Sequence, residues 1–194
     1  MTDARFVLSA ASASDFPKDG LPEVALVGRS NVGKSSLINA LVKKRIARTS
    51  AAPGKTRLAN YYLIESPIPN PKSLYLVDLP GYGYARGGTT ASEAFERLAG
   101  EYFTGGRRIA GVLHLIDARH PDLPQDAAAH DWLVTFHLPL AVVATKADNL
   151  GRAERIQMVR RFETTYPGPV LFVSAFKHEG MAQVLKVVAE WNRV

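Results

Sequence analysis

The 194 residues suit one domain, and a hydrophobic content of 46 % is ordinary for a globular protein with a sizeable core. The chain has no run of 18 apolar residues and no cysteine, which excludes a membrane-spanning helix, disulfides and cysteine metal sites. Residues 1–8 carry an acid early and lack a long apolar stretch, so we expect no signal peptide and a cytoplasmic protein. The net charge of +6 is uneven, because residues 43–57 hold six basic residues and no acidic one. We expect an exposed loop there, whose charge is explained either by contact with a polyanion or by simple solvation.

In chain order, the sequence predicts an extension followed by alternating strands and helices. Residues 1–21 have no strong periodicity and are expected to form an N-terminal extension to a domain of residues 22–194. Apolar runs typical of buried strands occupy residues 24–27, 109–116, 140–144 and 170–173. Helical patterns occupy residues 36–42, 91–104, 124–136, 152–165 and a last segment from about residue 180.

Two further strands are expected at residues 58–64 and 73–78. The proline-rich link between them, Pro67–Pro71, is short enough for a hairpin, so the two strands are expected to be antiparallel. The whole order predicts an α/β fold with a mostly parallel six-stranded sheet, one antiparallel strand and helices on both faces.

A complete phosphate-binding loop lies between the first buried strand and the helix that follows it. Residues 28–35 read GRSNVGKS, which matches G-x-x-x-x-G-K-[ST]. Gly28 and Gly33 let backbone N–H groups turn toward phosphate oxygens where a Cβ would obstruct them, and the N-terminus of the next helix points at the same anion. Lys34 can reach the β- and γ-phosphates, and the Ser35 hydroxyl can bind Mg²⁺. The flanking strand and helix argue against a chance glycine-rich turn.

Two other segments are expected to respond to the γ-phosphate. Asp78–Gly81 reads DLPG at the end of a strand, where open α/β sheets bind their ligands. Asp78 can hold Mg²⁺ through a water, and Gly81 can donate its backbone N–H to the γ-phosphate. Thr56, in the basic segment, can bind Mg²⁺ only while the γ-phosphate is present, which would make that segment a nucleotide sensor. Thr49 is the competing residue, and Thr56 is favoured.

Base specificity is predicted from Thr145–Asp148, which reads TKAD directly after a strand and matches the [NT]-K-x-D pattern of guanine-nucleotide proteins. A carboxylate at Asp148 suits guanine, whose N1–H and N2–H₂ are adjacent donors, whereas adenine offers no such pair. The stem of Lys146 can lie over the base. Ser174–Phe176 follows the next strand, and its backbone can contact the guanine oxygen. A polar turn would explain either segment alone, but with the phosphate loop they favour GTP.

All these motifs occur in one order, each at a junction between a strand and a loop. At this point the chain resembles the P-loop GTPases of the translation-factor class and, within them, the EngB family (also called YihA or YsxC) of bacterial ribosome-assembly GTPases. The resemblance covers about residues 16–192 and rests on Pro22–Asn39, Pro53–Thr56, Asp78–Ala85 and Asp117–His120. The chain departs from the family at two positions that remove no ligand. They are Arg57, where glutamine is usual, and Asn149, where lysine is usual.

The resemblance implies a three-layer P-loop GTPase fold, binding of GTP, GDP and Mg²⁺, slow hydrolysis, and action on the large ribosomal subunit and its rRNA. The family is also linked to normal cell division and septation. By the same resemblance Asn31 helps to hold K⁺, although an asparagine that only stabilises the turn is the alternative. Tyr82 stands where many small GTPases have a glutamine that orients the attacking water, and because its ring has no carboxamide, intrinsic turnover is expected to be slow. A monomer with no membrane-spanning segment and no DNA partner is expected.

The expected site residues form three groups. Those expected to act in catalysis are Lys34, Asn31, Thr56 and Gly81. Those expected to hold Mg²⁺ are Ser35, Thr56 and Asp78. Those expected to contact the nucleotide are Gly28, Arg29, Ser30, Asn31, Val32, Gly33, Lys34, Ser35, Ser36, Pro53, Gly54, Lys55, Thr56, Asp78, Leu79, Pro80, Gly81, Thr145, Lys146, Ala147, Asp148, Ser174, Ala175 and Phe176.

Three alternatives stay open at this point. They are an enzyme that uses ATP, a guanine-nucleotide-binding module with negligible turnover, and a GTPase of another RNA-related or septum-assembly pathway. The five histidines of the chain form no ligand cluster, and His114 falls in a buried strand, so we expect it to be a core residue.

Overall fold

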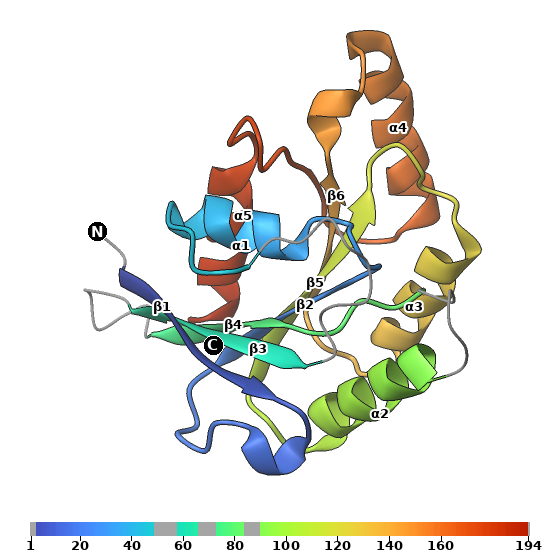
Figure 1. Cartoon of the computed structure of the whole chain (residues 1–194). Coiled ribbons are helices and arrows are strands. Elements are labelled where there is room, and N and C mark those ends of the chain that lie inside the picture. The colour runs from blue at the N-terminus through green and yellow to red at the C-terminus, as the bar shows by residue number, and fades with distance from the viewer. Residues whose placement is uncertain (1–2, 49–57, 66–72, 84–89, 194) are drawn as a thin grey trace.

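The computed structural model describes residues 3–48, 58–65, 73–83 and 90–193, with residues 90–94 as backbone only. Within these residues seven strands form one sheet in the order β1-β3-β4-β2-β5-β6-β7 (Figure 1). The strands are β1 (Asp3–Ala10), β2 (Glu23–Gly28), β3 (Ala59–Glu65), β4 (Leu74–Asp78), β5 (Ile109–Asp117), β6 (Leu140–Thr145) and β7 (Val170–Phe172).

Strand β3 runs against both of its neighbours, β1 and β4, whereas the pairings among β4, β2, β5, β6 and β7 are all parallel. The antiparallel pairing predicted for the strands at residues 58–64 and 73–78 is therefore confirmed, with Tyr61 opposite Val77. The sheet has seven strands rather than the predicted six, because the N-terminal segment adds β1 at the edge. Its pattern is hard to recognise, since a bulge between Phe6 and Leu8 breaks the alternation and Phe6 is 47 % exposed.

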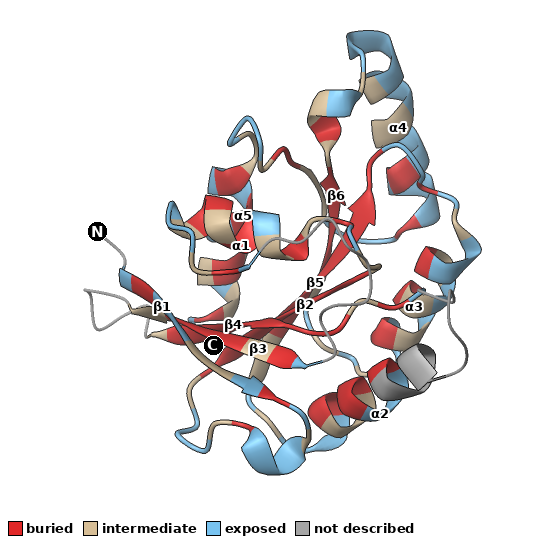
Figure 2. Ribbon diagram, in the orientation of Figure 1, coloured by how far each residue is buried: buried red, intermediate tan, exposed pale blue. Residues whose placement is uncertain are grey.

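Helices cover both faces of the sheet and complete three layers (Figure 1). Neighbouring strand residues point in opposite directions. Val24 and Leu26 of β2 pack with α1 (Lys34–Val42) and α5 (Met181–Trp191), while Ala25 and Val27 pack with α2 (Thr90–Thr104) and α3 (Pro124–Val134). Helix α4 (Arg152–Thr165) covers β6 through Phe162, which is fully buried. Figure 2 shows the central strands buried and the outer helix faces exposed, as expected for a parallel sheet covered on both sides.

The carboxyl ends of the parallel strands meet at one edge of the sheet. The loops that follow β2, β4, β6 and β7 therefore come together, although they are far apart in sequence. Such an edge is where open α/β sheets bind their ligands. Within the described residues no helix is both long and apolar enough to cross a membrane.

Candidate nucleotide-binding site

The phosphate-binding loop joins β2 to α1, and its backbone explains two of its residues. A Cβ on Gly28 would lie 2.7 Å from the carbonyl oxygen of Leu115, so only glycine lets the loop pass β5 at this distance. Gly33, the residue that precedes α1, has φ 114°, a conformation that favours glycine. Asn31 also lies in the left-handed region, with φ 63°, which asparagine tolerates better than most residues. The sequence thus fixes the shape of the loop before any ligand is considered.

Lys34, the first residue of α1, folds back across the loop. Its ammonium group donates to the carbonyl oxygen of Gly28 at 3.1 Å, and the residue is only 7 % exposed. Burial lowers the pKa of Lys34, and the nearby charge of Asp78 opposes that change. The cation is therefore held inside the loop that would surround the phosphates, where a low dielectric strengthens its attraction for them.

Ser35 and Asp78 form the part of the site that suits a divalent cation. The Ser35 hydroxyl donates to Asp78 Oδ2 at 2.9 Å, and Asp78 is 1 % exposed. Its other oxygen, Oδ1, is buried without a hydrogen-bond partner within the described residues. Burial raises the pKa of Asp78, while the charge of Lys34 and the Ser35 hydrogen bond lower it. A buried carboxylate oxygen beside a hydroxyl fits Mg²⁺, which takes oxygen ligands from one or two protein groups together with phosphates.

The segment after β4 packs directly on the phosphate loop. A Cβ on Gly81 would lie 2.6 Å from the backbone nitrogen of Ser30, which explains the glycine. That Ser30 nitrogen donates to the carbonyl oxygen of Tyr82 at 3.2 Å. The two predicted phosphate-contacting segments are therefore neighbours within the described residues.

Tyr82 points into the protein rather than toward the loop. Its hydroxyl donates to Asp126 Oδ1 at 2.8 Å and lies 2.7 Å from His114 Nε2. Asp126 is fully buried and also accepts a hydrogen bond from Arg29 Nε at 3.1 Å. One carboxylate on α3 thus anchors both the phosphate loop and the segment after β4. Sequence reasoning did not find Asp126, because an acid in the first turn of a helix is commonplace.

His114 is a core residue, as the sequence predicted, with no exposed surface. Burial, assisted by repulsion from His130, lowers the pKa of His114 to about 3. The ring is therefore neutral at physiological pH. Burial also raises the pKa of Asp126, and its hydrogen bonds with Tyr82 and Arg29 oppose that change.

A pocket of about 160 Å³ lies beside the phosphate loop, at the ends of β6 and β7. It brings together segments that are more than a hundred residues apart in the sequence. The predicted residues that line it are Val32, Gly33, Ser36, Thr145, Lys146, Asp148, Ala175 and Phe176. Within the described residues, the Asp148 carboxylate has no hydrogen bond or ion pair, so its oxygens are available to accept from a base. Thr145 instead ties the pocket to the loop, because its hydroxyl donates to the Val32 carbonyl oxygen at 2.7 Å.

Lys146 is positioned by Asp117, at the end of β5. Its ammonium group lies 3.1 Å from Asp117 Oδ2, and Arg119 Nε donates to Asp117 Oδ1 at 2.9 Å. Burial alone would raise the pKa of Asp117, but the hydrogen bonds from Arg119 and Lys146 outweigh it and hold that pKa well below its usual range. Before the structure, Asp117 was identified only as part of a family resemblance, and its role in holding Lys146 comes from the structure.

The remaining predicted residues are placed in different ways. Leu79 and Ala147 are buried, so only their backbones could contact a ligand, and the Ser174 hydroxyl accepts from the Lys177 backbone and shapes the loop that carries Phe176. The side chain of Arg29 is bound to Asp126. Pro53, Gly54, Lys55, Thr56 and Thr49 lie outside the described residues.

The chain is similar to proteins of one family over most of its length. A sequence profile described as "50S ribosome-binding GTPase" matches residues 23–146. A protein of Pelotomaculum thermopropionicum named "Probable GTP-binding protein EngB" is 41 % identical over 194 residues, which cover 97 % of this chain and 95 % of that protein. A protein of Leuconostoc citreum with the same name is 46 % identical over 155 residues, which cover 79 % of this chain and 77 % of that protein.

Solved structures show the same fold. The crystal structure of Era in complex with MgGDPNP and nucleotides 1506–1542 of 16S ribosomal RNA superposes with a TM-score of 0.75 at 23 % identity, covering 89 % of this chain and 57 % of the Era chain. This chain thus spans little more than half of Era. The crystal structure of a probable GTP-binding protein EngB gives a TM-score of 0.66 at 22 % identity, covering 88 % of this chain and 98 % of that one.

The three-layer fold, the phosphate loop and these relatives together define a P-loop GTPase, a guanine-nucleotide-binding switch protein. Within that class, the chain belongs to the EngB family. The family resemblance and the fold class predicted from the sequence are both confirmed.

Proposed function

We propose that this GTPase acts in the cytoplasm as a monomer, assists assembly of the large ribosomal subunit, and is needed for normal cell division. The observation that carries the proposal is that residues suited to phosphate and magnesium and a pocket suited to guanine lie at the same edge of the sheet. Buried Lys34 and Asp78, with the half-buried Ser35 beside them, suit a magnesium-bound triphosphate, and the pocket around Asp148 suits guanine. The matching family's description as 50S ribosome-binding supports the choice of partner. In this proposal residues 22–194 are the GTPase domain, and β1 from residues 1–21 extends its sheet.

The residues divide the work of binding and turnover. Lys34 attracts the β- and γ-phosphates, and Gly81 offers its backbone N–H to the γ-phosphate. Ser35 and Asp78 would hold Mg²⁺, which supplies positive charge against the phosphates when it is bound. Asp148 accepts from the N1–H and N2–H₂ groups of guanine, and the stem of Lys146 covers the base.

Turnover is expected to be slow without a partner. Tyr82 stands where other small GTPases have a water-orienting glutamine, and its hydroxyl is engaged by His114 and Asp126 instead. We propose that K⁺, held with the help of Asn31, supplies part of the missing charge stabilisation. Phosphate release measured in K⁺ and in Na⁺ tests this. We expect slow basal turnover that K⁺ accelerates, and equal rates in the two salts would contradict the role of Asn31.

The ribosomal function requires that nucleotide state and large-subunit affinity be coupled. We propose that Thr56 and Gly81 sense the γ-phosphate and that the basic residues of segment 43–57 contact rRNA. Allosteric coupling is usually about 1–3 kcal/mol. Binding is expected to weaken steeply with salt, because released counterions favour contacts with phosphates.

Co-sedimentation with large ribosomal subunits tests the proposal. We would measure the affinity with a non-hydrolysable GTP analogue and with GDP, each across a salt series. Tighter binding with the GTP analogue, and a steep salt dependence, are expected. An affinity that ignores both nucleotide and salt would reject the ribosomal role and favour a GTPase of another pathway.

A further inference from the structure

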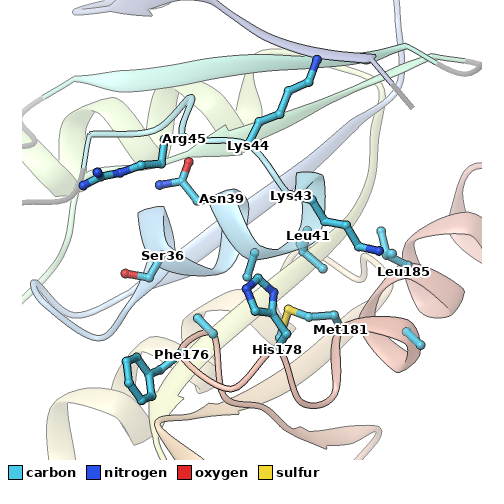
Figure 3. Close-up of a pocket in the computed structure, with 13 residues that line it drawn as sticks. Ser36, Asn39, Leu41, Lys43, Lys44, Arg45, Phe176, His178, Met181 and Leu185 are labelled. Atoms are coloured by element: carbon cyan, nitrogen blue, oxygen red, sulfur yellow. The ribbon is translucent and has the colours of Figure 1, made fainter. Parts of the chain in front are cut away.

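A larger groove adjoins the guanine pocket and is not explained by nucleotide binding. Its volume is about 990 Å³, and it lies between the second half of α1 with the turn after it and the segment from Ala175 into α5 (Figure 3). It is lined by Ser36, Asn39, Ala40, Leu41, Lys43, Lys44, Arg45, Ala175, Phe176, His178, Met181, Ala182 and Leu185. Ser36, Ala175 and Phe176 also line the guanine pocket, so the two hollows share a wall.

The groove exposes apolar side chains to solvent. Phe176 is 86 % exposed and Leu185 is 47 % exposed, and the buried side chains of Leu41 and Met181 also line the groove. In Figure 3 Phe176 lies at one end of the groove and Leu185 at the other. Exposed apolar side chains that share one groove mark binding surfaces more often than side chains scattered singly over a surface do.

The charge of the groove has one sign. Lys43, Lys44 and Arg45 line it together with His178, and among the described residues none that lines the groove is acidic. Lys44 points away and pairs with Asp3 of β1, as Figure 3 and the contact between the two residues show. Lys43 and Arg45 are exposed, and neither forms an ion pair within the described residues. The groove therefore suits a ligand that is both polyanionic and apolar.

We propose that this groove binds a single-stranded segment of RNA. Phe176 and the guanidinium of Arg45 offer flat surfaces on which unstacked bases pack, and Lys43 and Arg45 meet the phosphates. A duplex hides the faces of its bases and could not use the apolar lining, so a single strand fits better. The inference rests on the proposed ribosomal function and deepens it by naming the surface that meets rRNA. The RNA would lie against the wall of the guanine pocket, which places it within reach of the nucleotide-binding machinery.

Fluorescence anisotropy with a labelled RNA of about 12 nucleotides, in single-stranded and in duplex form, tests the proposal. The double variant Lys43→Asn/Arg45→Gln removes both free cations. Asparagine suits position 43 because Lys43 has φ 54°. The matched control is Arg152→Gln/Arg160→Gln, which removes two exposed, unpaired arginines from α4 in the described structure. Affinity for GDP serves as the check of folding in every variant.

We expect the groove variant to lose at least about tenfold in affinity for single-stranded RNA and to lower the slope of log K against log salt by about 1.4, since each single-strand phosphate contact contributes about 0.7. The control should stay within about twofold of the unaltered protein. A second pair separates the apolar lining from charge: Leu185→Glu should abolish RNA binding, whereas Ile156→Glu, on α4 and 54 % exposed, should weaken it far less.

Equal RNA affinity in groove and control variants would overturn the proposal, as would tighter binding of the duplex than of the single strand. Binding of poly-glutamate but not of RNA would identify an acidic peptide groove instead and would also overturn it. Large-subunit co-sedimentation keeps the two proposals distinct. If the groove variant binds subunits as the unaltered protein does, the groove proposal fails and the ribosomal function stands. If the unaltered protein binds no subunits, the ribosomal function fails, and the RNA titrations alone decide the groove.

Discussion

The phosphate half and the base half of the nucleotide site are built in different ways. In the phosphate half the charged groups are buried and held within the chain, Lys34 by the Gly28 carbonyl and Asp78 by Ser35. In the base half Asp148 is only partly buried and Phe176 is 86 % exposed, and their neighbours Asp117 and Ser174 shape the site from behind.

Because of this difference, we expect changes in the phosphate half to affect turnover and changes in the base half to affect nucleotide selectivity. The charges of the phosphate half have already lost their water, so they act in a preorganised environment where electrostatic interactions are strong. Changes there should alter both catalysis and stability. The base half meets its ligand at the surface, so changes there should alter which nucleotide binds while leaving the fold intact.

Replacing Lys34 with methionine should lower the rate of GTP hydrolysis by about 10²–10³-fold, the usual cost of removing one group that stabilises transition-state charge. The measurement is phosphate release in a single turnover at saturating GTP. The control is Lys186→Met, which removes an exposed lysine on α5. A loss smaller than about tenfold for Lys34→Met would show that the buried lysine does not act on the phosphates.

Replacing Tyr82 with phenylalanine should lower the free energy of unfolding by about 1–3 kcal/mol, because buried Asp126 and His114 each lose a hydrogen-bond partner. Urea unfolding without nucleotide gives the value. Tyr75→Phe is the matched control, since its hydroxyl donates at 2.8 Å to Asp19, which is exposed and can be solvated by water. Equal losses in the two variants would mean that the Tyr82 hydroxyl, despite its buried partners, stabilises the fold no more than the Tyr75 hydroxyl does.

Replacing Asp117 with asparagine should weaken GDP binding by about tenfold, because Lys146 loses the charged partner that positions it over the base. Isothermal titration calorimetry measures the change. Asp122→Asn, which removes the partner of exposed Arg161, is expected to leave GDP affinity unchanged. An unchanged affinity in Asp117→Asn would show that Lys146 is positioned by other contacts.

His114 should make stability depend on pH. Its folded pKa of about 3 lies below the unfolded value of 6.5, so its contribution is complete above pH 6.5 and is lost as the pH falls toward 3. Between pH 6 and pH 5 the loss from this group is about 1 kcal/mol. In His114→Gln that part of the slope should vanish, while the carboxylates common to both proteins cancel in the comparison. Parallel stability profiles would mean that His114 is not neutral and buried as described.

The fold was largely predictable from the sequence, and the reason lies in the strands. Buried parallel strands are continuous apolar runs, such as Val24–Val27 and Leu140–Ala144, and these are easy to recognise. Strand β1 was missed because only Ala4 and Ala10 are buried in it and a bulge interrupts its pattern. Its pairing with β3 is a long-range contact that no local pattern records.

The site was predictable where a motif occupies consecutive residues and unpredictable where one side chain supports another from a distant element. The phosphate loop, Asp78–Gly81 and Thr145–Asp148 belong to the first kind. The anchoring of Tyr82 by Asp126 spans 44 residues and belongs to the second. The inward direction of Tyr82 could not be inferred, because it depends on Asp126 of α3 and His114 of β5, which bind its hydroxyl.

The assignment of guanine selectivity to Asp148 is tested most directly by competition among GDP, ADP and XDP for the unaltered protein and for Asp148→Asn. We expect the unaltered protein to prefer GDP over ADP by at least about 100-fold, since a charge-assisted pair of hydrogen bonds is worth about 3 kcal/mol. Asp148→Asn should lose that preference, bind XDP in place of GDP and unfold at the same urea concentration as before. Equal affinity of the unaltered protein for GDP and ADP, or full GDP affinity in Asp148→Asn, would contradict the account.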